Sequence, residues 1–91
     1  LIESKGRPCL VIQTDVRQKA NCEAAVRQTV ERFGKLNILV NNAAYQMAQE
    51  NVLDISEEQL RRTFDTNILA YFFMAQAALP HLRENDTIVN T

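Results

Sequence analysis

The fold is decided by one stretch of the sequence, Leu36-Asn37-Ile38-Leu39-Val40-Asn41-Asn42-Ala43-Ala44. Its first five residues are mainly apolar, as in a strand that is buried on both faces of a parallel sheet. Asparagines and small residues follow, and this composition is typical of a loop that leaves the end of a strand. The stretch therefore predicts a buried strand over 36–40 with a polar loop at its carboxyl end.

The residues before this stretch predict a strand and a helix. Cys9–Thr14 is a short apolar run with β-branched residues between Pro8 and Asp15, which suits another strand buried on both faces. Over Gln18–Phe33 the apolar side chains recur at steps of three and four residues, the pattern of an amphipathic helix. Gly34 is placed to end that helix. The predicted order is strand, helix, strand.

The residues after the loop predict a long helix and a third strand. Ser56 and Gln59 have the spacing of a capping box, so the helix should begin there. Pro80 should kink or end it near Ala77, and Thr87–Thr91 is the next apolar strand. One stripe at helical spacing, typical of a face that packs on its neighbours, contains Leu60, Phe64, Asn67, Ile68, Tyr71, Ala75, Leu79 and Leu82.

Strands that alternate with helices of this length imply crossover connections and a parallel sheet. We therefore expect an α/β fold with a parallel sheet. No repeat or Pro/Gly/Ser-rich linker divides the sequence. The chain opens at Leu1 without an initiator methionine and ends at Thr91 within an apolar run, so we expect residues 1–91 to be the central fragment of a single domain.

Composition argues against several classes of partner. The net charge of -1 provides no basic field for a phosphate backbone, so nucleic acid is not expected as a partner. The longest apolar run, Ile68–Ala75, is far shorter than the roughly 20 residues that cross a bilayer, so no membrane partner is expected. Cys9 and Cys22 lack CxxC spacing and His81 is the single histidine, so we expect no metal site, ordinary free cysteines and a cytoplasmic protein.

Asp15 lies where a predicted strand meets a loop, and ligands of open parallel sheets bind beyond the carboxyl ends of the strands. A carboxylate there can accept a hydrogen bond from an exocyclic amine such as that of adenine, while Val16 offers backbone groups and an apolar contact. The same position suits a carboxylate that caps a helix or a turn. The residues alone leave both interpretations open.

Two other positions have the same ambiguity. Asn42, Ala43 and Ala44 follow a strand and leave space for a flat ligand, although Asn-Asn is also common in turns. Asn67 is a polar residue within the apolar stripe of the long helix, where a buried amide needs partners. Neighbouring backbone could satisfy the amide, or the amide and a distorted helix backbone could hold a water in a proton path.

Four segments resemble the central region of the short-chain dehydrogenase/reductase family in order and spacing: Thr14-Asp15-Val16, Leu39-Val40-Asn41-Asn42-Ala43-Ala44, Asn67-Ile68 and Ile88-Val89-Asn90-Thr91. The Asn-Asn-Ala-Gly element of the family is the most specific of these segments. Its final glycine is replaced here by Ala44, a variant that resembles the glucose/ribitol-dehydrogenase-like branch. The match covers nearly the whole chain.

This resemblance implies an α/β fold with a Rossmann-like doubly wound parallel sheet, of which the chain holds the central strands and helices as part of a single NAD(P)-binding domain. It also implies NAD or NADP as cofactor and a small alcohol or carbonyl compound as substrate. It implies that Asp15 and Val16 flank the adenine ring and that Asn42, Ala43 and Ala44 line the adenosine ribose region. By the same resemblance Asn41 braces the central sheet, and Asn67 is the relay asparagine that retains a water for the catalytic tyrosine, lysine and serine.

Residues 1–91 contain neither the glycine-rich turn nor the Tyr-x-x-x-Lys pair of the family, and by the resemblance the catalytic serine is expected just beyond Thr91. We therefore expect the parent protein to be an oxidoreductase and the isolated fragment to be inactive. The resemblance also implies a homo-oligomer, a dimer or tetramer formed through the long helix. The alternative is a non-catalytic scaffold or oligomerisation module that uses Tyr71, Phe72 and Phe73 as its association surface.

Overall fold

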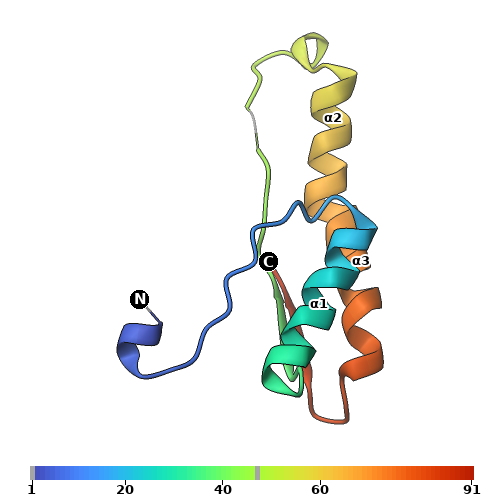
Figure 1. Ribbon diagram of the computed structural model, residues 1–91. Coiled ribbons are helices and arrows are strands. Elements are labelled where there is room, and N and C mark those ends of the chain that lie inside the picture. Colours follow the sequence, from blue (N-terminus) through green and yellow to red (C-terminus); the bar gives the residue numbers. More distant parts are fainter. Residues whose placement is uncertain (1, 47) are drawn as a thin grey trace.

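The computed structural model describes residues 2–46 and 48–91. Figure 1 shows helices packed side by side along one side of a small sheet, with one helical segment rising beyond it. The elements in chain order are η1 (Glu3–Lys5), α1 (Lys19–Phe33), β1 (Ile38–Asn41), η2 (Val52–Asp54), α2 (Glu57–Phe64), η3 (Asp65–Leu69), α3 (Ala70–Ala78), η4 (Leu79–His81) and β2 (Thr87–Asn90). Within the described residues, no helix is long and apolar enough to cross a bilayer.

The sheet consists of β1 and β2, which run parallel with Ile38 opposite Thr87 and Asn41 opposite Asn90. The helical segments α2, η3 and α3 connect the two strands, so the predicted crossover and parallel pairing are confirmed. Both strands end at the same edge of the sheet. The residues that follow β1 therefore meet the end of β2, which is the arrangement that the sequence predicts for a ligand site.

The prediction of strands buried on both faces is wrong for this chain. Cys9–Thr14 is extended but forms no strand, and Figure 1 shows this blue segment running apart from the two arrows. An extended segment needs a hydrogen-bonded neighbour to become part of a sheet, and β1 and β2 pair with each other. In β1 itself, Ile38 and Val40 are 61% and 56% exposed, because α3 packs on the opposite face of the strand.

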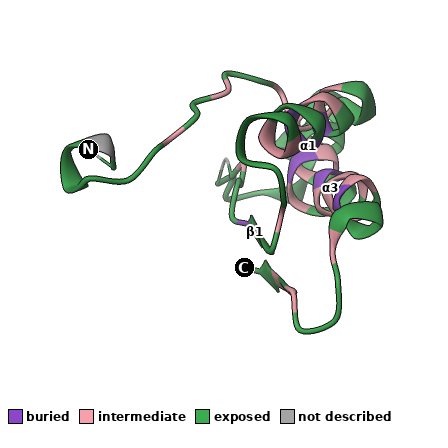
Figure 2. Cartoon of the chain, turned by 60° about the horizontal axis from the view of Figure 1, so that its bottom comes forward, coloured by how far each residue is buried: buried purple, intermediate pink, exposed green. Residues whose placement is uncertain are grey.

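The first long helix, α1, agrees closely with its prediction. It begins after Gln18 and ends at Gly34, whose φ of 83° is left-handed and whose N–H donates to Val30. Its buried residues pack against α3, and Figure 2 shows the buried positions gathered between these two helices. These buried residues of α1 are Cys22, Ala25 and Val26. The core of the described structure thus lies between the helices.

The second long helix begins and ends as predicted. The Ser56 hydroxyl accepts the Gln59 N–H at 3.0 Å, and the α-helix ends at Ala78, with Pro80 in the 3₁₀ turn that follows. Between α2 and α3 lies η3, a π-helical turn in which the Ala70 N–H donates to the Asp65 carbonyl, five residues back. A π turn holds one more residue than an α turn and recurs at functional sites.

The predicted packing stripe of this helix is wrong. Four large apolar side chains of the stripe are exposed, while the buried positions of the helix are Thr66, Ala70 and Ala78. The extra residue of η3 shifts the facing positions of α3 out of register with those of α2. In addition, α2 extends beyond α1 and the sheet (Figure 1), and α1 packs against α3. The four exposed residues are Leu60, Phe64, Ile68 and Leu79.

Candidate functional site

Two clefts open beside the segment that follows β1, and they share Val16 as a lining residue. The inner cleft, of about 70 Å³, is lined by Val16, Asn42 and Ala43 together with parts of β1 and α3. The Asp15 cleft, of about 260 Å³, is lined by Asp15, Val16 and Ala44 together with residues of α2 and η3. The structure therefore brings all five predicted cofactor-binding residues to two clefts at the carboxyl ends of the strands.

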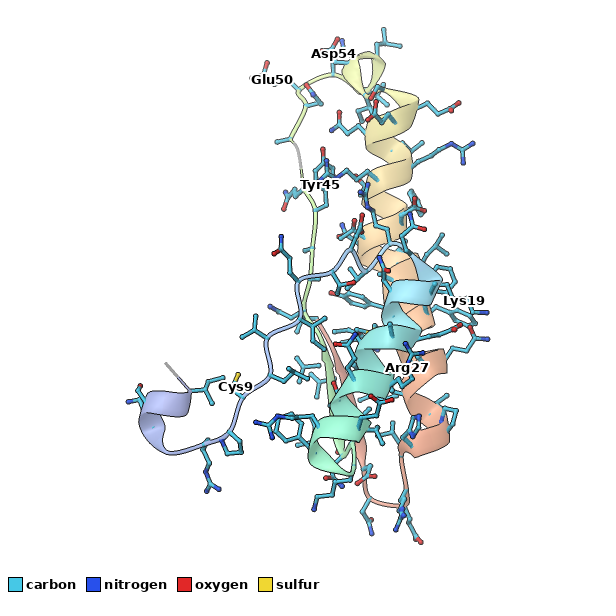
Figure 3. All side chains as sticks on the ribbon, viewed as in Figure 1. Cys9, Lys19, Arg27, Tyr45, Glu50 and Asp54 are labelled. Carbon is cyan, nitrogen blue, oxygen red and sulfur yellow. The ribbon has the colours of Figure 1, made fainter. Side chains whose placement is uncertain are left out.

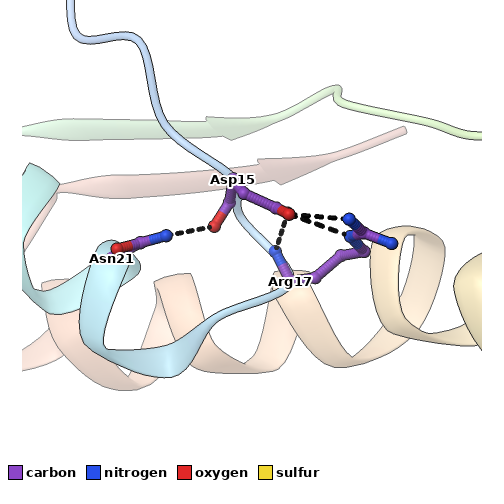
Figure 4. Close-up of polar contacts among 3 residues, drawn as sticks. All are labelled: Asp15, Arg17 and Asn21. Carbon is purple, nitrogen blue, oxygen red and sulfur yellow. Dashed lines mark hydrogen bonds and ion pairs between the residues drawn. The ribbon is translucent and has the colours of Figure 1, made fainter.

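The Asp15 carboxylate is held by Arg17, as Figure 4 shows. The Arg17 backbone N–H donates to Oδ1 at 3.0 Å, and its guanidinium donates through Nη2 to Oδ2 at 2.7 Å and through Nε to Oδ1 at 3.0 Å. These hydrogen bonds from the Arg17 side chain and backbone lower the pKa of Asp15 to about 2. Asp15 thus has the turn-capping contact that the sequence left open, and its side chain remains 42% exposed.

The first turn of α1 holds the backbone on the other side of this turn. The Asn21 amide donates to the Asp15 carbonyl at 3.0 Å (Figure 4), and the Cys22 thiol donates to the Val16 carbonyl at 3.2 Å. Cys22 is fully buried, and burial raises the pKa of its thiol. The thiol is therefore a packed structural group, as expected, and Asp15 and Val16 have a fixed position relative to α1.

Asn41 ties the two strands to the long helix. Its amide donates to the Asn90 side chain at 2.9 Å and lies 3.5 Å from the Tyr71 carbonyl. Asn41 is buried, so these contacts satisfy a polar group that would otherwise destabilise the core. The Thr91 hydroxyl lies 3.3 Å from the Asn41 carbonyl and 3.1 Å from the side-chain oxygen of Asn42. Asn41 therefore connects the two strands and the helix, which is the position that the resemblance implies for it.

Tyr71 lines the inner cleft, and its hydroxyl contacts the segments that follow both strands. Its hydroxyl lies 3.1 Å from both the Ala43 carbonyl and the Thr91 carbonyl, and its single hydrogen can be donated to one of them at a time. These contacts place the Tyr71 hydroxyl beside the ends of both strands. Phe72, by contrast, is 62% exposed.

Asn67 lies in η3 and forms a two-point clamp on Tyr45. The Tyr45 N–H donates to its side-chain oxygen at 2.8 Å, and its amide nitrogen donates to the Tyr45 carbonyl at 2.9 Å. Asn67 lines a third cleft, of about 290 Å³, which shares Ala44 and Tyr45 with the Asp15 cleft. Backbone groups of Tyr45 thus satisfy the Asn67 amide, which agrees with the structural interpretation of the sequence. The helix around Asn67 is also distorted, which is a feature of the relay interpretation.

The sequence analysis missed several residues of the Asp15 cleft. The Arg62 guanidinium lies 4.3 Å from the centre of the Tyr45 ring, and both residues line the cleft. Arg62 is far from Tyr45 in the sequence, so no local pattern joins them. Arg17 could have been found, because an arginine two residues after an aspartate in a turn is within reach of its carboxylate.

Other candidate groups lie outside these clefts. In residues 2–46 and 48–91, no cluster of histidine, cysteine and carboxylate side chains could hold a metal ion. His81 and the acidic residues of the loop before α2 are exposed, and Figure 3 shows Glu50 and Asp54 at the end of that loop, away from Tyr45. A larger groove, of about 410 Å³, lies between α1 and α3, but no predicted site residue lines it.

A parallel α/β arrangement with clefts at the carboxyl edge of its strands is the class of fold that binds nucleotides in doubly wound sheets. A family model described as enoyl-(acyl carrier protein) reductase matches residues 1–91. The chain is 54% identical over 90 residues to the uncharacterized oxidoreductase YhdF of Bacillus subtilis, covering 99% of this chain and 31% of that protein. The chain belongs to the short-chain dehydrogenase/reductase family.

Two further relatives agree with this assignment. Glucose and ribitol dehydrogenase of Daucus carota is 49% identical over 88 residues, which cover 97% of this chain and 30% of that protein. A crystal structure of a short chain dehydrogenase from Burkholderia cenocepacia in complex with NADP superposes with a TM-score of 0.93 at 36% identity, over 98% of this chain and 36% of that one. The chain thus spans about a third of each relative, and the expected Rossmann-like fold is confirmed.

Proposed function

We propose that the whole protein containing these residues is an NAD(P)-dependent oxidoreductase that transfers a hydride between the nicotinamide cofactor and a small alcohol or carbonyl substrate. The observation that carries this proposal is the convergence of the five predicted cofactor-binding residues on two clefts that share Val16. The relatives support it, since their names describe oxidoreductases and a dehydrogenase, and one was solved with NADP. The cofactor, when bound, supplies the hydride chemistry.

The residues present fit the adenosine half of such a cofactor. In the Asp15 cleft, the carboxylate provides an acceptor for the adenine amine and Val16 provides an apolar wall, while the methyl side chain of Ala44 leaves space. In the adjoining inner cleft, Asn42 and Ala43 can line the ribose. A mostly apolar wall with a few placed polar groups is the usual composition of a cofactor pocket.

Asn67 is proposed to support proton transfer. Its clamp on Tyr45 uses one amide N–H and one oxygen lone pair, which leaves a second N–H and a second lone pair for a water. The carbonyls of η3 add acceptors near the same point, because a π turn departs from regular α-helical bonding. In this role Asn67 positions the loop after β1 with its clamp and holds a water with its remaining groups.

The experiment for the proposed function is a binding and turnover assay on the full-length protein. Asp15→Ala should raise the dissociation constant for NADP or NAD by about tenfold or more, since a hydrogen bond to a charged group contributes about 1.5–3 kcal/mol. Glu50→Ala is the matched control, because it removes an exposed carboxylate at the far end of the loop (Figure 3). An unchanged dissociation constant in Asp15→Ala would contradict a role of Asp15 in cofactor binding and leave it only its contact within the turn.

The fragment itself should not catalyse the reaction. We propose that residues 1–91 alone are inactive, because the serine and the Tyr-x-x-x-Lys pair that the family uses are not in this sequence. A cofactor-reduction assay on the isolated 91-residue chain with a panel of alcohols tests this directly. Turnover above a heat-treated control would contradict the proposal.

We also propose a cytoplasmic homo-oligomer that associates through α3. Phe72 is 62% exposed and continues an apolar surface of the long helix, which supports association through that helix and is the same observation that favours the scaffold alternative. Cys9 and Cys22 are both free thiols, which fits a reducing compartment. Phe72→Glu should lower the sedimentation mass of the full-length protein, and an unchanged mass would remove α3 from the interface.

A further inference from the structure

The Asp15 carboxylate is almost fully used by one neighbour. Three N–H groups of Arg17 point at it: the backbone N–H, Nε–H and one of the Nη2 hydrogens. The Nε–H lies within hydrogen-bonding distance of both oxygens, at 3.0 Å from Oδ1 and 3.2 Å from Oδ2, but it is one proton. A carboxylate has about four lone-pair positions. Three donated protons therefore leave a single acceptor position on Asp15.

This remaining position is accessible from the Asp15 cleft. Asp15 and Arg17 both line the cleft, and their side chains are 42% and 35% exposed. The backbone of Asp15 cannot turn freely, because Asn21 of α1 holds its carbonyl at 3.0 Å (Figure 4). The Arg17 fork then fixes the plane of the carboxylate, since a guanidinium that donates through two nitrogens sets direction as well as energy. The one open acceptor has a defined direction.

The remaining acceptor position of Asp15 can bind an exocyclic amine on an aromatic ring. The carboxylate can accept one N–H but cannot donate, since Arg17 and, at longer range, Arg62 keep its pKa low. A ring with a carbonyl oxygen at the same position would bring a second acceptor against the Asp15 carboxylate, and the two oxygens would repel each other. The pair thus distinguishes an amine from a carbonyl at one position of a bound ring.

We propose that Arg17 is a positioning residue that aims the Asp15 carboxylate, so that this pair selects adenine over a 6-oxo purine in the cofactor. The proposal rests on the proposed function, because it needs a dinucleotide in the Asp15 cleft. It goes beyond that function by assigning the discrimination to the Asp15–Arg17 pair instead of to Asp15 alone. Arg17 acts through Asp15 and need not touch the cofactor.

The test compares two cofactors on the full-length protein by calorimetry. One is the adenine dinucleotide that the protein uses, and the other is its hypoxanthine counterpart, in which the exocyclic amine is replaced by oxygen. The wild-type protein should bind the adenine form about tenfold tighter or more, the value of one hydrogen bond to a charged group. Arg17→Ala should bring this ratio close to one, mainly by weakening the adenine form. Arg17→Lys should keep part of the ratio.

Lys19→Ala is the matched control, because it removes a cation two residues along the chain that does not line the Asp15 cleft. Its ratio should equal that of the wild-type protein. An unchanged ratio in both Arg17 variants would overturn the proposal, and a higher ratio would mean that Arg17 competes with adenine for Asp15. If the wild-type protein bound both dinucleotides equally well, the proposal would fail while cofactor binding stood. If it bound neither, the proposed function would fail as well.

Discussion

Replacing Asn67 by alanine tests the clamp on Tyr45 and the proposed relay in one variant. The change removes two hydrogen bonds, of 2.8 Å and 2.9 Å, and leaves the Tyr45 N–H and carbonyl without those partners. Each hydrogen bond contributes about 1 kcal/mol, and a buried group left without a partner costs about 1–3 kcal/mol. Because Asn67 is only partly buried, water can replace some of these contacts, and we expect a loss of about 2 kcal/mol in unfolding free energy.

The assay for this variant has two parts, denaturant unfolding and steady-state kinetics of the full-length protein. Asn51→Ala is the control, because its side chain also accepts a backbone N–H, that of Leu53 at 2.9 Å, but at an exposed position. It should lose about 1 kcal/mol or less. Asn67→Ala should lower kcat more than it weakens cofactor binding. If Asn67→Ala loses no more stability than Asn51→Ala, the clamp argument is refuted, and unchanged kcat would remove the relay role.

Three further predictions concern single contacts. The pKa of Asp15 lies at about 2, so the stability that its ionised form contributes is fully present above the ordinary pKa of about 3.9 and is lost as the pH falls towards 2. In Arg17→Ala the pKa should return towards the ordinary value, which removes this contribution; carboxyl chemical shifts followed by NMR would show the change, and equal pKa values would contradict it. Tyr71→Phe should reduce unfolding free energy by about 1 kcal/mol in thermal denaturation, because only the hydroxyl contacts to Ala43 and Thr91 are lost, and an unchanged melting temperature would mean that they contribute nothing. Gly34→Ala should cost about 1 kcal/mol in the same assay, since its φ of 83° disfavours a side chain although the space around it is open; a gain in stability would argue that the left-handed turn can relax.

Local signals in the sequence were sufficient for the ends of the helices. The Ser56 cap and the left-handed Gly34 depend on residues only a few positions away, and Pro80 sets the end of the long helix by its own ring. The strand over Cys9–Thr14 could not be settled in this way. An extended run becomes a strand only if another strand lies beside it, and that is a property of the whole sheet.

In the candidate site, too, local patterns predicted some residues, while others depend on how the chain folds. Asp15 was predicted because it lies where an apolar run meets a loop, and Asn67 because it is a polar residue within an apolar stripe. The partners that fix them were harder to see, since Tyr45 reaches Asn67 only after the chain has folded back along the helix. Even the π turn that surrounds Asn67 has no simple sequence signature, and its extra residue is what moved the packing face away from the predicted stripe.

The central claim is that the Asp15 cleft holds the adenine of a nicotinamide cofactor. A crystal structure of the full-length protein with NADP or NAD bound is the most direct measurement. We predict the exocyclic amine of adenine within hydrogen-bonding distance of the Asp15 carboxylate, with the Arg17 fork intact and the ribose beside Asn42 and Ala43. A cofactor bound with its adenine elsewhere, and water in the Asp15 cleft, would contradict the claim.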